Sequence, residues 1–498
     1  MTPLRDLALA FHALGHADPA GAGALPVRSG DLTLDSRRVA QGDIFCAVPG
    51  TVTDGRAYLA QARTQGAALV LLPEAPSEGV QAALGPLPYR VLPGLETQLS
   101  ALAHHYYGAP SKHLRVLGVT GTNGKTSVVA HCAHLLEALG VRTGTLGTLG
   151  VGFPGALEAT ALTTADPLTV QRALRNMLDA GAEAVAMEVS SHALAQGRVA
   201  SVAFEAAVMT NLTRDHLDYH GSMAAYGEAK RQLFLQPGLA LGVVNADDAF
   251  CRALPARMPC AVKTFTYALD DAAASVYLSR RRACAQGWQF EGQSPWGAFM
   301  GRSGLAGAHG LSNLLAALTT LGALGYSLTA LASVLSTVPA APGRLERFFH
   351  PRGVELFVDY AHTPEALAVA LSALRRPDGG RLLCVFGCGG DRDRGKRPLM
   401  GAAAAAGADA LFLTNDNPRS ESPEAILAEI AAGVDRPVPC YRIADRAAAL
   451  RAALDEAAPG DRILLAGKGH ETMQVGAEGA MPFSDRALVA DLCAREGR

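Results

Sequence analysis

The chain has 498 residues and a formal net charge of −2, with 49% hydrophobic and 18% charged residues. This length exceeds what one hydrophobic core supports, so we expect about three domains. The near-neutral charge gives no indication of a nucleic-acid-binding or membrane surface. Nine cysteines without a CxxC pair argue against a metal cluster and favour reduced thiols.

The start of the chain carries charges at Arg5 and Asp6 and lacks a long apolar stretch. We therefore expect no signal peptide. Nowhere does an uninterrupted apolar run reach the roughly eighteen residues of a transmembrane helix. These features predict a cytoplasmic protein.

Residues 1–94 are expected to form a small leading α/β domain. Residues 42–48 and 67–72 are apolar and predict strands, with a helix at 57–66 between them. No acid–base pair stands out in this part of the chain. We expect its loops to hold a polar ligand.

Residues 95–340 contain a phosphate-binding loop. An apolar strand at 116–119 leads into the glycine-rich sequence TGTNGKT at 120–126, and an apolar helical pattern follows at 127–139. Such a loop presents backbone N–H groups to phosphate, while Lys125 reaches the outer phosphates and Thr126 can ligate Mg²⁺. The usual pattern has glycine where this chain has Val119, so the loop is a variant. ATP and Mg²⁺ are the expected ligands.

Two further strands of this region end in polar residues. The strand 184–188 ends in Glu188, at the edge of the sheet where the phosphate loop also lies, which places a carboxylate for Mg²⁺. The strand 206–209 leads into a cluster that contains His216 and His220. Lys230 lies on the next helix, where its position alone predicts a solvent-exposed side chain. Asp166 and Pro167 predict a helix start.

Residues 341–498 are expected to form a third domain, after a proline-rich linker at 338–344. Four apolar strands are each followed by a polar loop, at 359–364, 387–397, 415–419 and 467–471. In a parallel sheet such loops share the edge where ligands bind. There is no GxGxxG sequence with a downstream acid, which argues against a dinucleotide domain.

These modules together indicate an ATP-driven joining reaction. No Ser-His-Asp set or reactive cysteine motif is present, which argues against covalent catalysis by the protein. A phosphorylated substrate intermediate needs mainly cations and magnesium to stabilise the transferring phosphoryl group.

The motifs TGTNGKT, MEVSSH, TNLTRDHLDYHG, GEAKR, PGRLE, DYAHTP, GCGGDRDRGKRPLMG, DNPR and GKGHE occur here in one order. The series resembles the Mur ligases of bacterial peptidoglycan synthesis, and within that family the type that adds meso-2,6-diaminopimelate. The resemblance covers the whole chain. It implies an α/β protein of three domains: a small UDP-binding domain, a central ATPase domain of P-loop type with a mostly parallel sheet, and a C-terminal Rossmann-like domain.

The resemblance also implies the reaction. ATP phosphorylates the glutamate carboxylate of UDP-N-acetylmuramoyl-L-alanyl-D-glutamate, and an incoming amine attacks the acyl phosphate through a tetrahedral intermediate. The implied partners are this UDP-linked dipeptide, ATP and meso-diaminopimelate. We expect a monomer that binds neither nucleic acid nor membrane.

Catalytic and nucleotide-binding residues follow from the matching motifs. The implied catalytic residues are Lys125, Glu188, His216 and Lys230. Mg²⁺ is expected at Thr126, Glu188, His216 and Lys230, with the lysine carried as a carbamate (N6-carboxylysine). The implied ATP contacts are Gly121, Thr122, Asn123, Gly124, Lys125, Thr126, Ser127, Asn313, Arg344, Asp359 and His362.

Two further groups bind the substrates to be joined. The resemblance assigns the UDP-linked dipeptide to Leu34, Ser36, Thr51, Val52, Thr53, Thr163, Thr164, Ser190, Gln196 and Arg198. It assigns meso-diaminopimelate to Arg392, Asp416, Asn417, Pro418, Arg419, Gly467 and Glu471. The second carboxylate of this amino acid calls for a planar, bidentate cation, which Arg419 supplies, while Glu471 suits an ammonium group.

Two positions depart from the family pattern. The adenine-side segment reads HGLSN at 309–313, so only Asn313 of the two usual asparagines remains. Leu162 stands where some relatives have asparagine. The alternatives are a ligase of the same fold that adds lysine or another amino substrate, a folate-polyglutamate synthase, and a nucleotide-gated scaffold without catalysis. Arg419 and the GHE segment argue against the first two, and intact Lys125, Glu188 and Lys230 argue against the third.

Overall fold

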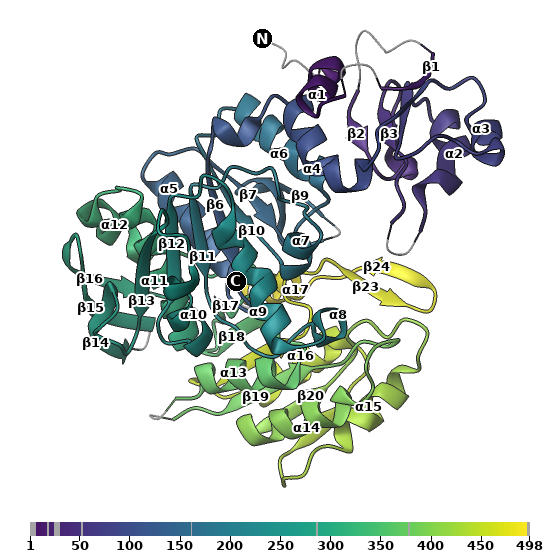
Figure 1. Ribbon diagram of the computed structural model, residues 1–498. Coiled ribbons are helices and arrows are strands. Elements are labelled where there is room, and N and C mark those ends of the chain that lie inside the picture. Colours follow the sequence, from purple (N-terminus) through teal and green to yellow (C-terminus); the bar gives the residue numbers. More distant parts are fainter. Residues whose placement is uncertain are drawn as a thin grey trace. The chain divides into compact units, whose positions relative to one another are not determined.

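The computed structural model describes residues 6–16, 19–23, 30–50, 53–160, 162–284, 287–376 and 379–495 (Figure 1). It divides into two compact units. One comprises residues 1–277, 293–297 and 315–331, and the other comprises residues 278–292, 298–314 and 332–498. In these described ranges no helix has both the length and the apolar character needed to cross a membrane.

The first unit begins with a five-stranded sheet in the order β1-β5-β4-β3-β2, parallel except for β1. Alternate residues of β3 and β4 enter two separate apolar clusters, so the sheet is buried on both faces. Its elements are α1 (Leu7–Ala13), β1 (Gly21–Ala22), β2 (Leu32–Thr33), β3 (Ile44–Cys46), α2 (Leu59–Thr64), β4 (Leu69–Leu72), α3 (Glu78–Leu84), β5 (Tyr89–Val91) and α4 (Leu95–Tyr106).

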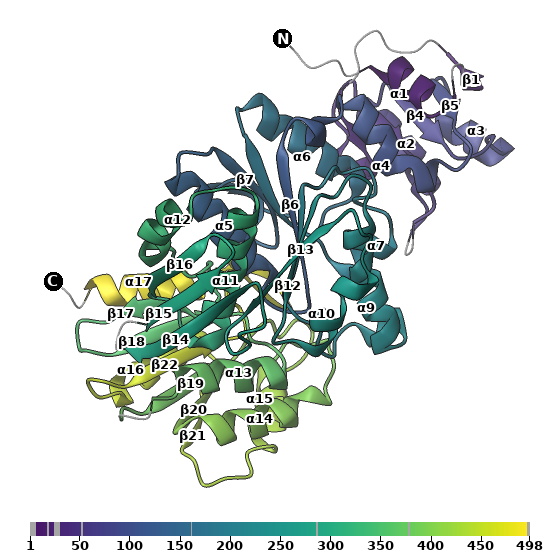
Figure 2. The same cartoon turned by 60° about the vertical axis from the view of Figure 1, so that its left-hand side comes forward.

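The same unit contains the larger central sheet. Of its eleven strands, the eight that lie wholly in this unit follow the order β13-β12-β11-β6-β10-β7-β8-β9 and are parallel from β13 to β7. Helix α5 lies on one side of this sheet, and α7, α9 and α10 lie on the other (Figure 2). The elements are β6 (Arg115–Thr120), α5 (Lys125–Ala138), β7 (Thr143–Gly147), β8 (Gly150–Phe153), β9 (Ala156–Glu158), α6 (Pro167–Asp179), β10 (Ala184–Glu188), α7 (Ser191–Ala195), β11 (Ala206–Met209), α8 (Leu217–His220), α9 (Met223–Arg231), β12 (Leu241–Asn245), α10 (Ala249–Ala253) and β13 (Lys263–Ala268).

The predicted helix start at Asp166 is confirmed, because its carboxylate accepts hydrogen bonds from Leu168 and Thr169 at the first turn of α6. The helix after the phosphate loop begins at Lys125, two residues before its expected start. Residues between 276 and 334 belong partly to each unit. They form β14 (Val276–Cys284), β15 (Gly287–Ser294), β16 (Gly297–Ser303), α11 (Gly307–Ala323) and α12 (Leu328–Val334).

The second unit contains a six-stranded sheet in the order β17-β18-β22-β19-β20-β21, in which only β17 is antiparallel. The four predicted polar loops therefore do leave one edge of a parallel sheet. Its elements are β17 (Glu346–Phe349), β18 (Glu355–Asp359), α13 (Pro364–Leu374), β19 (Leu382–Phe386), α14 (Lys396–Gly407), β20 (Ala410–Leu413), α15 (Pro423–Ala431), β21 (Cys440–Arg442), α16 (Arg446–Glu456), β22 (Arg462–Ala466), β23 (Met473–Gly476), β24 (Gly479–Pro482) and α17 (Asp485–Arg495).

A buried ion pair fastens α16 and α17 to this sheet edge. Arg446 donates from Nε and Nη2 to the two carboxylate oxygens of Asp485, at 2.7 Å each, and both side chains are fully buried. Arg446 also donates to the carbonyls of Asn415 and Ala466, which follow β20 and end β22. The pair thus holds the carboxyl ends of two strands in place.

Removing one partner of this pair leaves a buried charge without compensation. Asp485→Ala should lower the free energy of unfolding by about 3–5 kcal/mol, measured by chemical denaturation. The matched control is Asp455→Ala, because Asp455 lies 3.7 Å from Arg352 on the surface. Asp455→Ala should lower the free energy of unfolding by less than about 0.5 kcal/mol. If both variants lose the same amount of stability, the buried pair of Arg446 and Asp485 does not stabilise the fold as described.

Candidate active site

The phosphate loop connects β6 to α5. Its backbone takes positive φ values at Gly121 (143°) and Gly124 (85°), which favour glycine. A Cβ atom at Gly121 would lie 1.9 Å from Oγ1 of Thr210, so a side chain does not fit there. The loop is therefore shaped both by its own glycines and by the neighbouring strand end.

Residues 210–213 brace this loop, a role that the sequence reasoning missed. The backbone N–H of Thr122 donates to the carbonyl of Asn211, and that of Asn123 donates to its side-chain Oδ1, at 3.0 Å each. Thr210 donates from Oγ1 to the carbonyl of Asn123 at 2.5 Å. The available signal was their place directly after a strand, since β11 pairs with β6 in parallel.

Two lysines meet at the carbonyl of Gly121. Lys125 donates from Nζ to the carbonyls of Gly121 and Thr122 at 2.9 Å, and Lys230 donates to Gly121 at 2.8 Å. Lys230 is 1% exposed, so the exposure expected from its helical position is wrong. Burial, and then the charge of Lys125, hold the pKa of Lys230 well below its usual value. The aromatic ring of Tyr226 lies 4.4 Å from its Nζ.

Glu188 ends β10 beside the phosphate loop, as expected from the sequence. Thr126 donates from Oγ1 to Oε2 of the carboxylate at 3.0 Å. Thr148, which the sequence reasoning missed, donates from its backbone N–H to Oε1 at 2.7 Å and from Oγ1 to Oε2 at 3.3 Å. The carboxylate is 2% exposed and is held by three donors at the edge of the sheet.

This donor set fits a magnesium ion that is shared with a nucleotide. Mg²⁺ in phosphate-transfer sites uses one or two protein oxygens and completes its shell with waters and phosphates. Glu188 and the hydroxyl of Thr126 supply such oxygens next to the loop. Among the described residues, no three His, Cys, Asp or Glu side chains converge as a metal site.

An aromatic cluster that includes His216 lies on the same unit around His192. The His192 ring centroid is 4.8 Å from that of His216, 4.2 Å from that of Tyr219 and 5.4 Å from that of His220. His216 has a positive φ of 51° at the start of α8. Burial lowers the pKa of His192 and of His220. The same cluster includes Tyr226, whose hydroxyl donates to Oγ1 of Thr122 at 3.3 Å.

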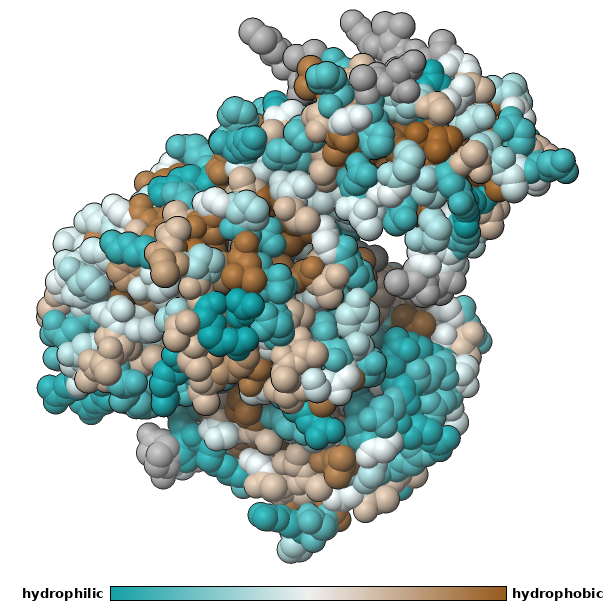
Figure 3. Space-filling view, in the orientation of Figure 1, coloured by the Kyte–Doolittle hydropathy of each residue, from teal (hydrophilic) through white to brown (hydrophobic). Residues whose placement is uncertain are grey.

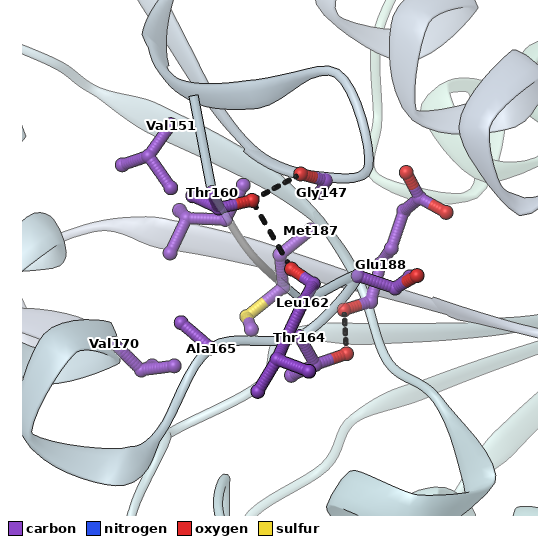
Figure 4. Close-up of a pocket in the computed structure, with 11 residues that line it drawn as sticks. Gly147, Val151, Thr160, Leu162, Thr164, Ala165, Val170, Met187 and Glu188 are labelled. Carbon is purple, nitrogen blue, oxygen red and sulfur yellow. Dashed lines mark hydrogen bonds between the residues drawn. The ribbon is translucent and has the colours of Figure 1, made fainter. Parts of the chain in front are cut away.

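Of the residues predicted to contact the dipeptide, Thr164, Ser190, Gln196 and Arg198 form one hydrogen-bonded group. Thr164 donates from Oγ1 to the main-chain carbonyl of Glu188 at 2.9 Å and accepts from the backbone N–H of Ser190 at 3.0 Å. Its own carbonyl accepts from Arg198 at 2.8 Å, and Arg198 also donates to Oε1 of Gln196. Figure 4 shows Thr164 beside the Glu188 main chain and Thr160 between Gly147 and Leu162.

Thr163 joins this group through its hydroxyl, which accepts a hydrogen bond from Thr148 at 3.2 Å. The pocket of Figure 4 continues into a larger one of about 330 Å³, which shares Thr160, Leu162 and Ala165 with it. Two arginines, Arg38 and Arg172, lie in the wall of the larger pocket.

The described residues among the predicted uridine contacts lie in the loops that follow strands of the leading sheet. Ser36 is buried and donates to Oε1 of Gln61 at 2.8 Å, and Leu34 packs against the apolar core. The Thr53 carbonyl accepts from the backbone N–H of Gly50 at 2.9 Å. Thr51 and Val52 lie outside the described residues.

In the second unit, the predicted nucleotide residues gather at the end of β18. The Asp359 carboxylate accepts from the backbone N–H groups of Leu345 and Ala361 at 2.7 and 2.8 Å. Burial raises its pKa. Arg344 lies over the ring of Tyr360 at 4.8 Å, and Nδ1 of His362 lies 2.8 Å from the Tyr360 carbonyl oxygen. Asn313 is buried in the same unit.

The predicted amine-binding residues also lie together, around a lysine that the sequence reasoning did not assign. Lys468 is fully buried and donates to Oδ1 of Asn417, Oε2 of Glu471 and the carbonyl of Met473, at 3.0, 2.9 and 2.7 Å. Asn417 donates from Nδ2 to the same oxygen of Glu471 at 3.0 Å. These donors lower the pKa of Glu471 against the effect of its burial. Gly467 leaves room for Asp416, whose Oδ2 would lie 2.5 Å from a Cβ atom there.

Arg419 has an unusual backbone and a fixed side chain. Its φ is 53°, and its N–H donates to the carbonyl of Val475 in the β23–β24 hairpin at 3.0 Å. Its Nη1 donates to the carbonyls of Gly390 and Asn417 at 2.7 and 3.4 Å. Within the described part of the chain, its Nε and Nη2 donate no hydrogen bond. Pro418 precedes it and is buried, whereas Arg392 is exposed nearby.

Three family descriptions match successive parts of the chain. Residues 31–107 match the catalytic domain of the Mur ligase family, residues 119–321 match the Mur ligase middle domain, and residues 343–469 match the glutamate ligase domain of Mur ligases.

Curated relatives match over nearly the full length. The UDP-N-acetylmuramoyl-L-alanyl-D-glutamate--2,6-diaminopimelate ligase of Ectopseudomonas mendocina (strain ymp) is 48% identical over 458 residues, 91% of this chain and 93% of the relative. The enzyme of that name from Pseudomonas aeruginosa is 48% identical over 465 residues, 92% and 95% of the two chains.

Solved structures give the same overall match. A structure of a ligase with that name has a TM-score of 0.70 and 34% identity, and covers 100% of this chain and 99% of its own. MurF from Acinetobacter baumannii has a TM-score of 0.69 at 18% identity, with 99% of both chains covered, which shows the shared fold. The expected three-domain α/β fold with a mostly parallel central sheet is thereby confirmed.

The close packing of Glu188 against β7 yields a testable prediction. A Cβ atom at Gly147 would lie 2.3 Å from Oε1 of Glu188. Gly147→Ala should therefore displace the carboxylate and weaken Mg²⁺-dependent ATP binding about tenfold or more, as for a lost hydrogen bond to a charged group. Calorimetric titration of ATP with and without Mg²⁺ measures this loss.

The control is Gly79→Ala, because a Cβ atom at Gly79 in α3 meets no atom within 4 Å. It should leave ATP binding unchanged. If Gly147→Ala also binds Mg²⁺ and ATP normally, Glu188 does not hold the metal in the way described.

Proposed function

Because the chain belongs to the Mur ligase family, we propose that it adds meso-2,6-diaminopimelate to UDP-N-acetylmuramoyl-L-alanyl-D-glutamate, at the expense of ATP, in peptidoglycan precursor synthesis. Support comes from the near-full-length relatives of that name and from the solved structure that carries it. The family motifs assign residues of this chain to each of the three substrates, and these assignments are part of the proposal.

One observation carries the proposal. The Glu188 carboxylate accepts from Thr126 of the phosphate loop, and the main-chain carbonyl of the same residue accepts from Thr164 of the dipeptide group. A nucleotide on the loop and a carboxylate substrate on the Thr164 side would therefore meet at Glu188. This is the arrangement that transfer of a phosphoryl group to that carboxylate requires.

The phosphate loop would bind the nucleotide. Residues 121–127 surround the phosphates, and Lys125 leaves its two carbonyl acceptors to contact the outer phosphate. Glu188 and Thr126 would hold Mg²⁺, which when bound neutralises charge on the transferring phosphoryl group. We assign Asn313, Arg344, Asp359 and His362 to the nucleotide as well, because their motifs resemble those of the family. The last three share the end of β18.

Lys230 would serve as a carbamate. Its burial favours the neutral amine, which is the form that reacts with CO₂, and the product is an anion beside Lys125. A carbamate there, together with His216, supplies oxygen and nitrogen ligands for a second Mg²⁺.

The dipeptide would lie along the group of Thr163, Thr164, Ser190, Gln196 and Arg198. Arg198 and the hydroxyls orient its glutamate carboxylate toward the phosphate loop, so that this carboxylate attacks the γ-phosphate and ADP leaves. The uridine end would contact Leu34, Ser36 and the loop 51–53. The larger pocket, with Arg38 and Arg172 in its wall, adjoins the Thr163–Thr164 turn.

The amine substrate would bind where residues 416–419 meet Gly467 and Glu471. The Nε and Nη2 atoms of Arg419 form a planar fork for the distal carboxylate, while Oε1 of Glu471 can accept from the ammonium group. Arg392 is placed to contact the same ligand. The attacking amine expels phosphate from the acyl phosphate and forms the amide.

We further propose a monomer located in the cytoplasm, where ATP is supplied. We place the domain boundaries at residues 1–94, 95–340 and 341–498, in agreement with the separate sheets in these parts of the chain.

The choice of amine tests this assignment directly. Wild-type protein with ATP, Mg²⁺ and the UDP-linked dipeptide should release phosphate with meso-diaminopimelate and far less with lysine. Arg419→Ala should raise the KM for diaminopimelate by an amount equivalent to roughly 2–5 kcal/mol, with little change in the KM for ATP. The exposed Arg436→Ala is the control. Phosphate release with lysine alone would show that the protein adds lysine. No phosphate release with either amine would favour a scaffold protein without catalysis.

The carbamate of Lys230 gives a second prediction. Lys230→Ala should lose turnover and regain part of it with a small added carboxylate such as acetate. In wild-type protein equilibrated with ¹³C-bicarbonate, a carbamate carbonyl resonance should appear in the NMR spectrum and be absent from the variant. The exposed Lys263→Ala should keep both the resonance and the activity. Full turnover of Lys230→Ala without any carboxylate would refute the role.

A further inference from the structure

Among the described residues, Arg397, in the first turn of α14, has one of the largest fully buried side chains. Its guanidinium makes a bidentate contact with Glu421, with Nη1 to Oε2 at 2.9 Å and Nη2 to Oε1 at 2.8 Å. Nη1 also donates to Glu429 of α15 at 2.8 Å, and Nη2 donates to the carbonyl of Gly389 at 3.3 Å. A fully buried guanidinium with two carboxylate partners is a costly feature that needs a reason.

The contacts of Arg397 reach the two loops around Arg419. Gly389 lies next to Gly390, whose carbonyl accepts from Nη1 of Arg419. Glu421 follows Arg419 by two residues in the other loop. Arg397 thus bonds to both loops, the one that carries Arg419 and the one that accepts its hydrogen bond. None of the hydrogen bonds found among the described residues joins the two arginines directly.

Further bonds close the same two loops onto one another. The N–H of Gly390 donates to the carbonyl of Asn417 at 2.9 Å, and the N–H of Asp391 donates to Oε1 of Glu421 at 2.6 Å. Ser420 donates from Oγ to the Asp391 carboxylate at 2.7 Å. A Cβ atom at Gly390 would lie 1.9 Å from the Pro418 carbonyl oxygen, so the two loops pack too closely at this point for a residue with a side chain.

This support is needed because the Arg419 backbone is strained. A φ of 53° is uncommon for a residue with a side chain, and Asp391 in the facing loop has a φ of 52°. The surrounding structure must hold both residues in these conformations. The Arg397 side chain is buried, whereas those of Glu421 and Glu429 are 21% and 29% exposed. Figure 3 shows a mainly hydrophilic surface where α15 lies in Figure 1.

We propose that Arg397 is a positioning residue for amine selection: through Glu421 and Gly389 it fixes the loops that aim the Arg419 guanidinium at the distal carboxylate of the substrate. This inference rests on the proposed role of Arg419. The lysine side chain has the same charge but not the planar fork, so lysine does not replace arginine at position 397.

The test compares KM values for the three substrates in the full chain. Arg397→Lys should raise the KM for diaminopimelate roughly tenfold, as for coupled residues in one network, while the KM values for ATP and the UDP-linked dipeptide change less than about twofold. Glu421→Gln breaks the same contact from the partly exposed side and should act alike, also if Arg397→Lys fails to fold. A uniform rise in all three KM values, or none for diaminopimelate, would overturn the proposal.

The matched control is Arg462→Lys. Arg462 donates to Glu355 and to the carbonyl of Leu374, but it lies at the start of β22, at the opposite end of that strand from the loops. This variant should lower the melting temperature without changing the KM for diaminopimelate. A similar rise in that KM would show that any lost arginine pair has this effect, which would overturn the specific role of Arg397.

A double variant separates this inference from the proposed function. If Arg397 acts through Arg419, adding Arg397→Lys to Arg419→Ala should change the KM for diaminopimelate less than about twofold further. If the double variant instead raises the KM for diaminopimelate by the product of the two single-variant factors, the positioning role is rejected. If Arg419→Ala alone leaves that KM unchanged, the amine-site assignment fails; if it raises the KM and Arg397→Lys does not, only the positioning role fails.

Discussion

The parallel pairing of β6 with β10 is the constraint on which the site depends. The register sets Val119 opposite Glu188, so the strand that leads into the phosphate loop ends beside the strand that ends in the carboxylate. The next strands on each side, β11 and β7, deliver Thr210, Asn211 and Thr148 to the same edge. Loop, carboxylate and braces therefore come from four adjacent strand ends, and a shift of register would separate all of them.

Much of this arrangement could be predicted from the sequence because strand ends and glycine loops are local signals. The apolar runs predicted β6, β10 and β11, and the rule that ligands bind at the carboxyl edge of a parallel sheet predicted that Glu188 lies beside the loop. The burial of Lys230 could not be predicted this way. It depends on the packing of α9 against the loop and the Tyr226 ring, and helical position alone indicated exposure.

In the second unit, too, some features could be predicted from the sequence and others could not. Its four strand-end loops were predicted, and the resemblance named the residues around Arg419. Lys468 and Arg397 stand inside the quoted motifs GKGHE and GCGGDRDRGKRPLMG. Their roles depend in part on contacts with residues 24 to 51 positions away in the chain, which the motifs do not reveal. Glu471 was expected to face an ammonium group, yet one of its oxygens is already used by Lys468 and Asn417. Only its other oxygen can serve a substrate.

The central claim is that Glu188 joins the nucleotide to the substrate carboxylate, so that this carboxylate attacks the γ-phosphate. Isotope transfer measures that step directly. UDP-linked dipeptide labelled with ¹⁸O in the glutamate side-chain carboxylate is incubated with ATP, Mg²⁺ and diaminopimelate, and the released phosphate is analysed by mass spectrometry. The account predicts one ¹⁸O atom in each phosphate, because the acyl phosphate breaks between carbon and the bridging oxygen. Amide formation with unlabelled phosphate would contradict it.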